Sequence, residues 1–181
     1  MTTVSDGSVP HIDSAPPTPH INSTPPTRPA GSAASEDSAA LEVDTVFGVP
    51  AHPGYQAEQL IAKLGIRLVE CGPGRVVGTM PVTGNRQPVG IMHGGANAAF
   101  AETLGSLAAW AHAGPGGRAV GLDLSCTHHR WVSSGLVTGT ATALHEGRAT
   151  ATYEIVIVDE SGRRTCTARL TCAIGKRRRT T

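Results

Sequence analysis

The chain alternates between short apolar stretches and small breaks, which predicts two groups of strands separated by one long helix. In the first group, strands over 66–71 and 75–81 flank the turn Gly72-Pro73-Gly74 and are expected to form a hairpin. A short helix over 57–64 is predicted before them. Four more strands are predicted at 119–130, 136–145, 150–158 and 165–174. Because the loops between successive strands are short, these strands must run antiparallel.

The long helix is predicted from Gly94 to about His112, where most positions are apolar or small. The breaker Gly114-Pro115-Gly116-Gly117 follows it. A helix that is apolar or small on every side is a buried helix. The expected fold class is therefore α+β, with an antiparallel sheet wrapped around one long central helix. Short strands cannot cover such a helix fully, so we expect a second copy of the chain to help.

Composition divides the 181 residues into three parts. Residues 1–44 are dominated by Pro, Ser, Thr and Ala and contain seven of the thirteen prolines, which predicts a disordered leader. A single domain is expected over 45–175, followed by a solvated basic tail over 176–181. The sequence shows no signal-peptide core and no apolar run near the roughly 20 residues of a membrane span. We therefore expect a cytoplasmic protein that has no membrane partner.

Charge and cysteine content disfavour further classes of partner. The net charge is +1, which gives no reason to expect a nucleic acid. Four cysteines lie inside predicted strands and form no CxxC pair: Cys71, Cys126, Cys166 and Cys172. This usage indicates reduced, packed thiols rather than disulfides or a zinc site.

Glu102 is the only formally charged side chain between His93 and Arg118, and it lies in the middle of the predicted buried helix. The plain interpretation of an isolated helix glutamate is that it faces water or caps a neighbouring donor. This helix offers it no polar face, however, and burying an isolated carboxylate is costly. Ser106 lies four residues later, on the same side of the helix. A carboxylate and a hydroxyl in an otherwise apolar wall indicate a functional site.

His93 immediately precedes the helix, which begins with Gly94 and Gly95. The first amides of a helix lack intrahelical partners and lie at the positive end of its dipole, so they can receive a carbonyl oxygen that becomes anionic. A histidine here could equally be a cap or a surface residue. His93 and Glu102 lie about 13 Å apart along the helix axis. If both are catalytic they belong to different subunits, with antiparallel helices meeting across a two-fold axis.

The segment from Gln87 to Gly95, QPVGIMHGG, and the later AETLGS from Ala101 to Ser106 resemble the hotdog-fold acyl-CoA thioesterases. The likeness is to the PaaI-like branch, and within it to the bacterial 1,4-dihydroxy-2-naphthoyl-CoA and aryl-CoA thioesterases. It extends from about Gly65 to Ile174. The resemblance implies the hotdog fold, hydrolysis of an acyl-CoA whose CoA is part of the substrate, no separate cofactor, and a homodimer with shared active sites. Such dimers commonly pair into tetramers.

The resemblance also implies a role for individual residues. Gln87 and His93 would orient the thioester, and the amide of Gly94 would polarise its carbonyl. Glu102 would act as the nucleophile or as the base for water, two roles that the sequence does not separate. Substrate contacts fall to Gly95, Ser106 and His128, and the candidates for binding the CoA phosphates are Arg130 and Arg148.

Regular alternation in the strand over 119–130 would place His128 on its apolar face, as a substrate-site residue or as a satisfied interior histidine. The other residues expected on that face are Val120, Leu122, Leu124 and Cys126. His129, on the opposite face, is expected to be solvated.

Two other functions remain open at this level. A metal hydrolase would use His93, His128 and His129, but no HxH, HxxxH or ExxH spacing presents two ligands from one element, so no metal site is predicted. A non-catalytic acyl-CoA-binding protein would need only the hotdog architecture, although a pure binder has no need of a buried Glu102. The apolar helix suits an aromatic or a medium-chain acyl group equally.

Overall fold

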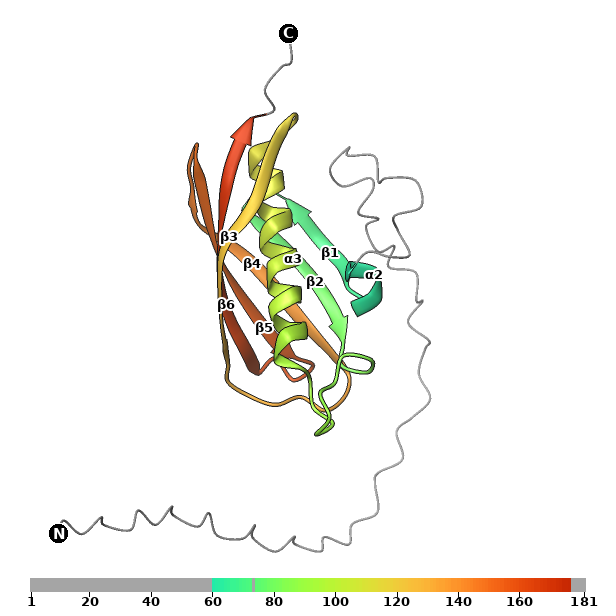
Figure 1. The fold of residues 1–181 in the computed structure, drawn as a ribbon. Helices are drawn as coiled ribbons and strands as arrows, with labels where there is room; N and C mark the ends of the chain where they lie inside the picture. Colours follow the sequence, from blue (N-terminus) through green and yellow to red (C-terminus); the bar gives the residue numbers. More distant parts are fainter. Residues whose placement is uncertain (1–59, 73, 177–181) are drawn as a thin grey trace, which may run out of the picture. The chain divides into compact units, whose positions relative to one another are not determined.

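The computed structural model describes residues 60–72 and 74–176 (Figure 1). Its elements are α2 (Leu60–Leu64), β1 (Arg67–Gly72), β2 (Arg75–Pro81), α3 (Gly94–Ala113), β3 (Gly117–His128), β4 (Leu136–Glu146), β5 (Thr150–Asp159) and β6 (Arg164–Lys176). The six predicted strands and the long helix are all present. The predicted leader over 1–44, the start of the helix over 57–64 and nearly all of the basic tail lie outside the described residues.

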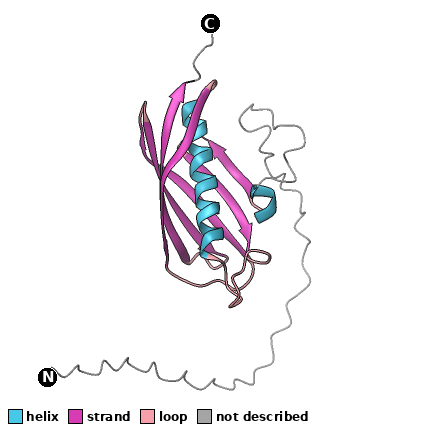
Figure 2. Ribbon diagram, viewed as in Figure 1, coloured by secondary structure: helices cyan, strands magenta, loops and turns pink. Residues whose placement is uncertain are grey.

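The six strands form one antiparallel sheet in the order β1-β2-β4-β5-β6-β3. The helix α3 crosses one face of this sheet and contacts every strand (Figures 1 and 2). This confirms the predicted α+β architecture of a sheet around one long helix. No helix in the described part of the chain is long and apolar enough to cross a membrane.

Two facing glycines set how closely α3 approaches the sheet. Gly78 of β2 and Gly139 of β4 are direct cross-strand partners. A Cβ atom at Gly78 would lie 2.9 Å from Leu104, and one at Gly139 would lie 2.6 Å from Leu104 and 2.8 Å from Phe100. Both helix side chains are fully buried. The absent glycine side chains therefore let the core-facing side of α3 settle onto the sheet, which fixes the helix that carries the candidate site.

The strand β3 pairs with β6 and lies at the edge of the sheet, not beside β4, although only a short loop separates β3 from β4. Instead of turning back as a hairpin, the loop over 129–135 crosses the end of the sheet (Figure 1). Its amides at His129 and Arg130 donate to the carbonyl of Thr165, and its Val132 carbonyl accepts from the amide of Met92. These bonds attach the loop to β6 and to the segment just before α3.

A bulge in β3 makes the predicted alternation wrong for the first half of the strand. Gly121 pairs with Cys172 and Asp123 pairs with Thr171, so Leu122 is an extra residue. The extra residue reverses which side chains face the core. Val120, before the bulge, is 66% exposed, and Leu122, at the bulge, is 63% exposed. After the bulge, Leu124 and Cys126 pack against the core as predicted.

All four cysteines are free thiols, and Cys166 and Cys172 are buried. Burial is the main reason why the pKa of the Cys166 thiol is raised to about 12. A thiol with so high a pKa is protonated and unreactive at neutral pH. This agrees with the packed, reduced cysteines predicted from the sequence.

Candidate active site

His93 is the N-cap of α3. Its Nδ1 accepts a 2.8 Å hydrogen bond from the amide of Gly95, so the cap role that the sequence left open is present. Because Nδ1 accepts, the neutral ring carries its proton on Nε2, and the exposed side chain can donate that hydrogen to a ligand. Among the described residues, the Gly94 amide has no hydrogen-bond partner. The start of α3 therefore offers two hydrogen-bond donors to a ligand, the Gly94 amide and His93 Nε2.

A cleft of about 330 Å³ opens beside this helix start. It brings together four of the predicted site residues: Gln87, Gly94, His128 and Arg130. The rest of its lining is Ile91, Met92, Asn97, His129 and Trp131. The cleft joins the segment before α3, the first turn of α3 and the end of β3, which the crossing loop holds side by side.

The imidazole of His128 lies directly against Gly94. A Cβ atom at position 94 would be 3.0 Å from His128 Nε2, so a larger residue there would press on the ring. The Nδ1 atom of the same ring lies 3.5 Å from Asn97 Nδ2. Since an amide nitrogen only donates, this orientation makes Nδ1 the acceptor and leaves the hydrogen of His128 on Nε2, the ring atom that lies beside Gly94.

Asn97 is a residue of the cleft that the sequence analysis missed. It is 5% exposed, and its Oδ1 has no hydrogen-bond partner among the described residues. A buried polar atom without a partner costs stability, so it marks a place where a ligand or a water can bind. Its signal in the sequence is a single amide side chain one turn after His93 in an otherwise apolar helix.

Glu102 lies on the flank of α3 that faces β3, half-buried and away from the cleft. Its Oε1 accepts a 3.1 Å hydrogen bond from Ser106 Oγ, which confirms that the two side chains share one side of the helix. A Cβ atom at Gly121 would collide with this carboxylate oxygen, so the glycine makes room for Glu102. Burial and, after it, the negative charge of Glu102 raise the pKa of the Cys172 thiol on β6.

The predicted site residues thus fall into separate groups within one chain. Glu102 and Ser106 do not line the cleft at the start of α3. Arg148 lies in the turn between β4 and β5, next to Gly147, whose carbonyl is 3.0 Å from Nε2 of His112 near the other end of α3. Arg130 and Arg148 therefore lie at opposite ends of the helix.

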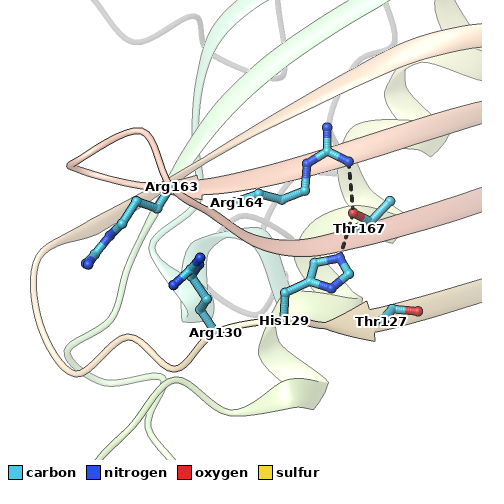
Figure 3. A pocket seen from close by; sticks show the side chains of 6 residues that line it. All are labelled: Thr127, His129, Arg130, Arg163, Arg164 and Thr167. Atoms are coloured by element: carbon cyan, nitrogen blue, oxygen red, sulfur yellow. Dashed lines mark hydrogen bonds between the residues drawn. The ribbon is translucent and has the colours of Figure 1, made fainter.

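A second cleft of about 570 Å³ adjoins the first at His129 and Arg130 (Figure 3). Its other lining residues are Thr127, Arg163, Arg164 and Thr167. The Oγ1 atom of Thr167 lies 2.9 Å from His129 Nε2 and accepts a 3.4 Å bond from Arg164. His129 was expected to be solvated; it is exposed, but it belongs to a strongly basic cleft that was not predicted.

Among the described residues, no group of three His, Cys, Asp or Glu side chains is arranged to hold a metal ion. The three histidines considered for a metal site have different contacts. His93 Nδ1 accepts from the Gly95 amide, the His128 ring lies against Gly94, and His129 contacts Thr167. The cleft is instead lined by hydrogen-bond donors suited to a carbonyl oxygen or an anion.

Comparison with known proteins gives the family. The family model described as "Thioesterase superfamily" matches residues 89–166. The chain is 48% identical over 116 residues to "Proofreading thioesterase EntH" of Klebsiella pneumoniae, covering 64% of this chain and 85% of that protein. It is 49% identical over 114 residues to a "Putative esterase" of Deinococcus radiodurans, covering 62% of this chain and 72% of the other.

Solved structures agree with this assignment. The structure of a thioesterase of Haemophilus influenzae superposes with a TM-score of 0.64 at 36% identity, covering 68% of this chain and 87% of that one. The structure of a mutant thioesterase of Pseudomonas aeruginosa gives a TM-score of 0.63 at 33% identity, covering 69% of this chain and 91% of that one. The chain therefore belongs to the Thioesterase superfamily of hotdog-fold thioester hydrolases, which confirms the resemblance stated from its sequence motifs.

Proposed function

We propose that the chain hydrolyses the thioester of an acyl-CoA in a homodimer, with each active site combining the cleft of one subunit and Glu102 of the other. The observation that carries this proposal is that, within one chain, the hydrogen-bond donors of the cleft and the carboxylate of Glu102 lie apart. The cleft contains the free Gly94 amide and His128 but no carboxylate among its lining residues. Glu102 has a carboxylate but no free backbone donors, because it lies in mid-helix.

The edge strand β3 supports a dimer of this kind. Within the described sheet it pairs on one side only, with β6. Its exposed Val120 and Leu122 would be covered by a second copy of the chain. Antiparallel pairing of two β3 strands would bring the two α3 helices together across a two-fold axis, with the start of one helix near the middle of the other. Further pairing into a tetramer is a separate step that a measured mass would reveal.

In such a site the thioester carbonyl would accept from the Gly94 amide at the positive end of the α3 dipole, with His93 and Gln87 orienting the thioester. Glu102 then either attacks the carbonyl carbon, giving an anhydride that water hydrolyses, or takes a proton from the water that attacks. In both routes the tetrahedral oxyanion collapses, the carbon–sulfur bond breaks, and the CoA thiolate takes up a proton. Ser106 would hold the carboxylate through its 3.1 Å hydrogen bond.

The proposed acyl group is aromatic, such as 1,4-dihydroxy-2-naphthoyl, or of medium chain length. The cleft supports an apolar acyl group, because Ile91, Met92 and Trp131 line it together with the polar groups. Arg130 supports binding of the CoA phosphates, and Arg148 of the second subunit would approach the same site if the helices are antiparallel. Hydrolysis rates across a matched panel of aryl-CoA and fatty acyl-CoA esters separate the two acyl classes.

Mixing two inactive variants tests the shared site. His93→Ala and Glu102→Ala chains are each expected to be inactive as homodimers. After subunit exchange, half of the dimers are mixed, and each mixed dimer has one intact site, so about a quarter of the wild-type activity should return. Exchange is verified by mass with differently tagged chains. Absence of recovery after verified exchange would contradict the shared site, and recovery of activity by either variant alone would remove that residue from the mechanism.

A further inference from the structure

A row of three small residues crosses the sheet under the carboxylate of Glu102. Ala151 of β5 pairs with Cys172 of β6, which in turn pairs with Gly121 of β3. Directly paired residues of an antiparallel sheet point to the same face. A Cβ atom at Gly121 would collide with Glu102 Oε1, so this face is the one turned towards α3. The fully buried side chain of Cys172 therefore points towards the flank of the helix that carries Glu102 and Ser106.

Cys172 is the only one of the three with a hydrogen-bonding side chain. Burial and then the negative charge of Glu102 raise the pKa of its thiol, and a hydrogen bond with Ser106 offsets part of this rise. The thiol is therefore protonated at neutral pH and has an S–H to donate. Ser106 gives its own hydrogen to Glu102 Oε1 at 3.1 Å, so its oxygen has a lone pair with which to accept one. Because a carboxylate only accepts, the hydrogen bonds run from Cys172 to Ser106 to Glu102.

Thr103 shows the alternative that is open to a hydroxyl on this helix. Its Oγ1 donates a 2.8 Å hydrogen bond to the carbonyl of Ala99, four residues back along the helix. Such a backward bond is a common choice of serine and threonine inside a helix. For Ser106 the equivalent acceptor is the backbone carbonyl of Glu102, yet its hydroxyl donates to the Glu102 carboxylate instead. An S–H directed at the Ser106 oxygen occupies one of its lone pairs, which restricts the directions left to the hydroxyl hydrogen.

We propose that Cys172 is a positioning residue of the reaction: its thiol donates to Ser106, and Ser106 in turn holds the Glu102 carboxylate in its reactive orientation. The inference rests on the proposed function, because the orientation of Glu102 affects the rate only if Glu102 reacts. It goes further by giving a role to a buried cysteine that does not line the cleft. Loss of the thiol should slow the chemical step and leave binding unchanged, because the donors at the start of α3 are untouched.

Four substitutions at Cys172 separate hydrogen bonding from packing. Valine and alanine offer no donor, whereas serine and threonine each offer a hydroxyl. In Cys172→Val and Cys172→Ala, kcat should fall by about threefold with KM unchanged, and Cys172→Ser and Cys172→Thr should restore it. Packing alone gives the opposite order, because valine suits a buried apolar position and serine does not. Val76→Ala, a fully buried change on β2, controls for a cavity in the core and should leave kcat unchanged.

The S–H stretching vibration of Cys172 tests the hydrogen bond without any turnover. Its infrared band, isolated by subtracting the spectrum of Cys172→Val, should move to higher frequency in Ser106→Ala, because loss of a hydrogen bond strengthens the S–H bond. Thr103→Val removes a hydroxyl from the same helix and should leave the band in place. An unmoved band in Ser106→Ala, or a wild-type kcat in Cys172→Val, overturns the inference even if Glu102→Gln is inactive. Full activity of Glu102→Gln refutes the proposed function, whichever way the band moves.

Discussion

The start of α3 and its middle carry chemically opposite groups: hydrogen-bond donors at the start and a carboxylate in the middle. At the start, the Gly94 amide has no described partner and the rings of His93 and His128 lie close by, so the region donates hydrogen bonds. In the middle, Glu102 carries a carboxylate that accepts a hydrogen bond from Ser106, and the backbone amides there are already bonded within the helix. A helix has free donors only in its first turn, and it can hold a half-buried carboxylate only where its neighbour leaves space. Under the proposed function, one helix would supply two complementary halves of a reaction centre, joined across a two-fold axis.

Removing the carboxylate of Glu102 is expected to have the largest effect on activity. Glu102→Gln keeps the shape of the side chain but cannot act as nucleophile or base, so kcat should fall by roughly 10³-fold. Binding of a non-hydrolysable CoA ester, measured by calorimetry, should change little, because the donors at the start of α3 are untouched. Unchanged turnover would refute the catalytic role of Glu102, whereas loss of both binding and fold would assign it a structural role.

Displacing the carboxylate without removing it should have a smaller effect. Gly121→Ala puts a methyl group where Glu102 Oε1 now lies, and Gly121 has no positive φ that an alanine would strain. We expect kcat to fall by about 100-fold because a catalytic group is misplaced, with a small change in the unfolding midpoint. Gly175→Ala on β6 is the control, since a Cβ atom there meets nothing within 4 Å. Equal kcat for the two alanine variants would show that Glu102 needs no defined position.

The donor end of α3 can be altered through Asn97. Asn97→Leu removes the contact with His128 and also the unpartnered Oδ1, whose burial costs about 1–3 kcal/mol. We therefore expect kcat to fall by about threefold to tenfold while the free energy of unfolding rises or stays the same. Thr103→Val is the control on the same helix, because the Thr103 hydroxyl bonds only to the Ala99 carbonyl of its own turn. A parallel fall in kcat and in stability would indicate a purely structural role for Asn97.

The smallest effect is expected at Asp159, which lies outside both regions and orders the turn beside the basic cleft of Figure 3. Burial alone would raise the pKa of this carboxyl, but hydrogen bonds from Arg163 and Ser161 outweigh it and lower the pKa. The resulting stabilisation is fully present above the unfolded-state pKa of about 4 and is lost as the pH falls through the lower folded value. Asp159→Asn should reduce the urea midpoint at pH 7 and leave a smaller difference near pH 3. A difference that is independent of pH would show that the charge of Asp159 does not stabilise the turn.

Much of the fold was predictable because its signals are local. The helix was expected to begin at Gly94 and end near His112, and it spans Gly94–Ala113, because small and apolar residues and a glycine-proline breaker delimit it. The strand β2 has the predicted bounds. The edge position of β3 and its bulge at Leu122 were not predictable, because both depend on pairing with β6, which lies more than 35 residues further along the chain.

The candidate site shows the same division. The family resemblance named Gln87, Gly94, His128 and Arg130 among its site residues, and these four line one cleft in the structure. The other named residues are not in its lining: His93, Gly95, Glu102, Ser106 and Arg148. Trp131 and Arg164 gave no signal on their own, since exposed aromatic and basic residues are common at loops and strand ends. They line clefts because the crossing loop brings the end of β3 next to the start of β6, where the amides of His129 and Arg130 bond to Thr165.

By itself the sequence determined that one buried helix begins at a histidine followed by two glycines and carries a single carboxylate nine residues later. Periodicity, breakers and helix geometry are properties of neighbouring residues, so they can be read along the chain. Only the tertiary structure decided that Gly121 makes the space for Glu102, that His128 rests on Gly94, and that a basic cleft adjoins the cleft at the start of α3. These are contacts between segments far apart in sequence, and their geometry exists only after the sheet has closed around α3.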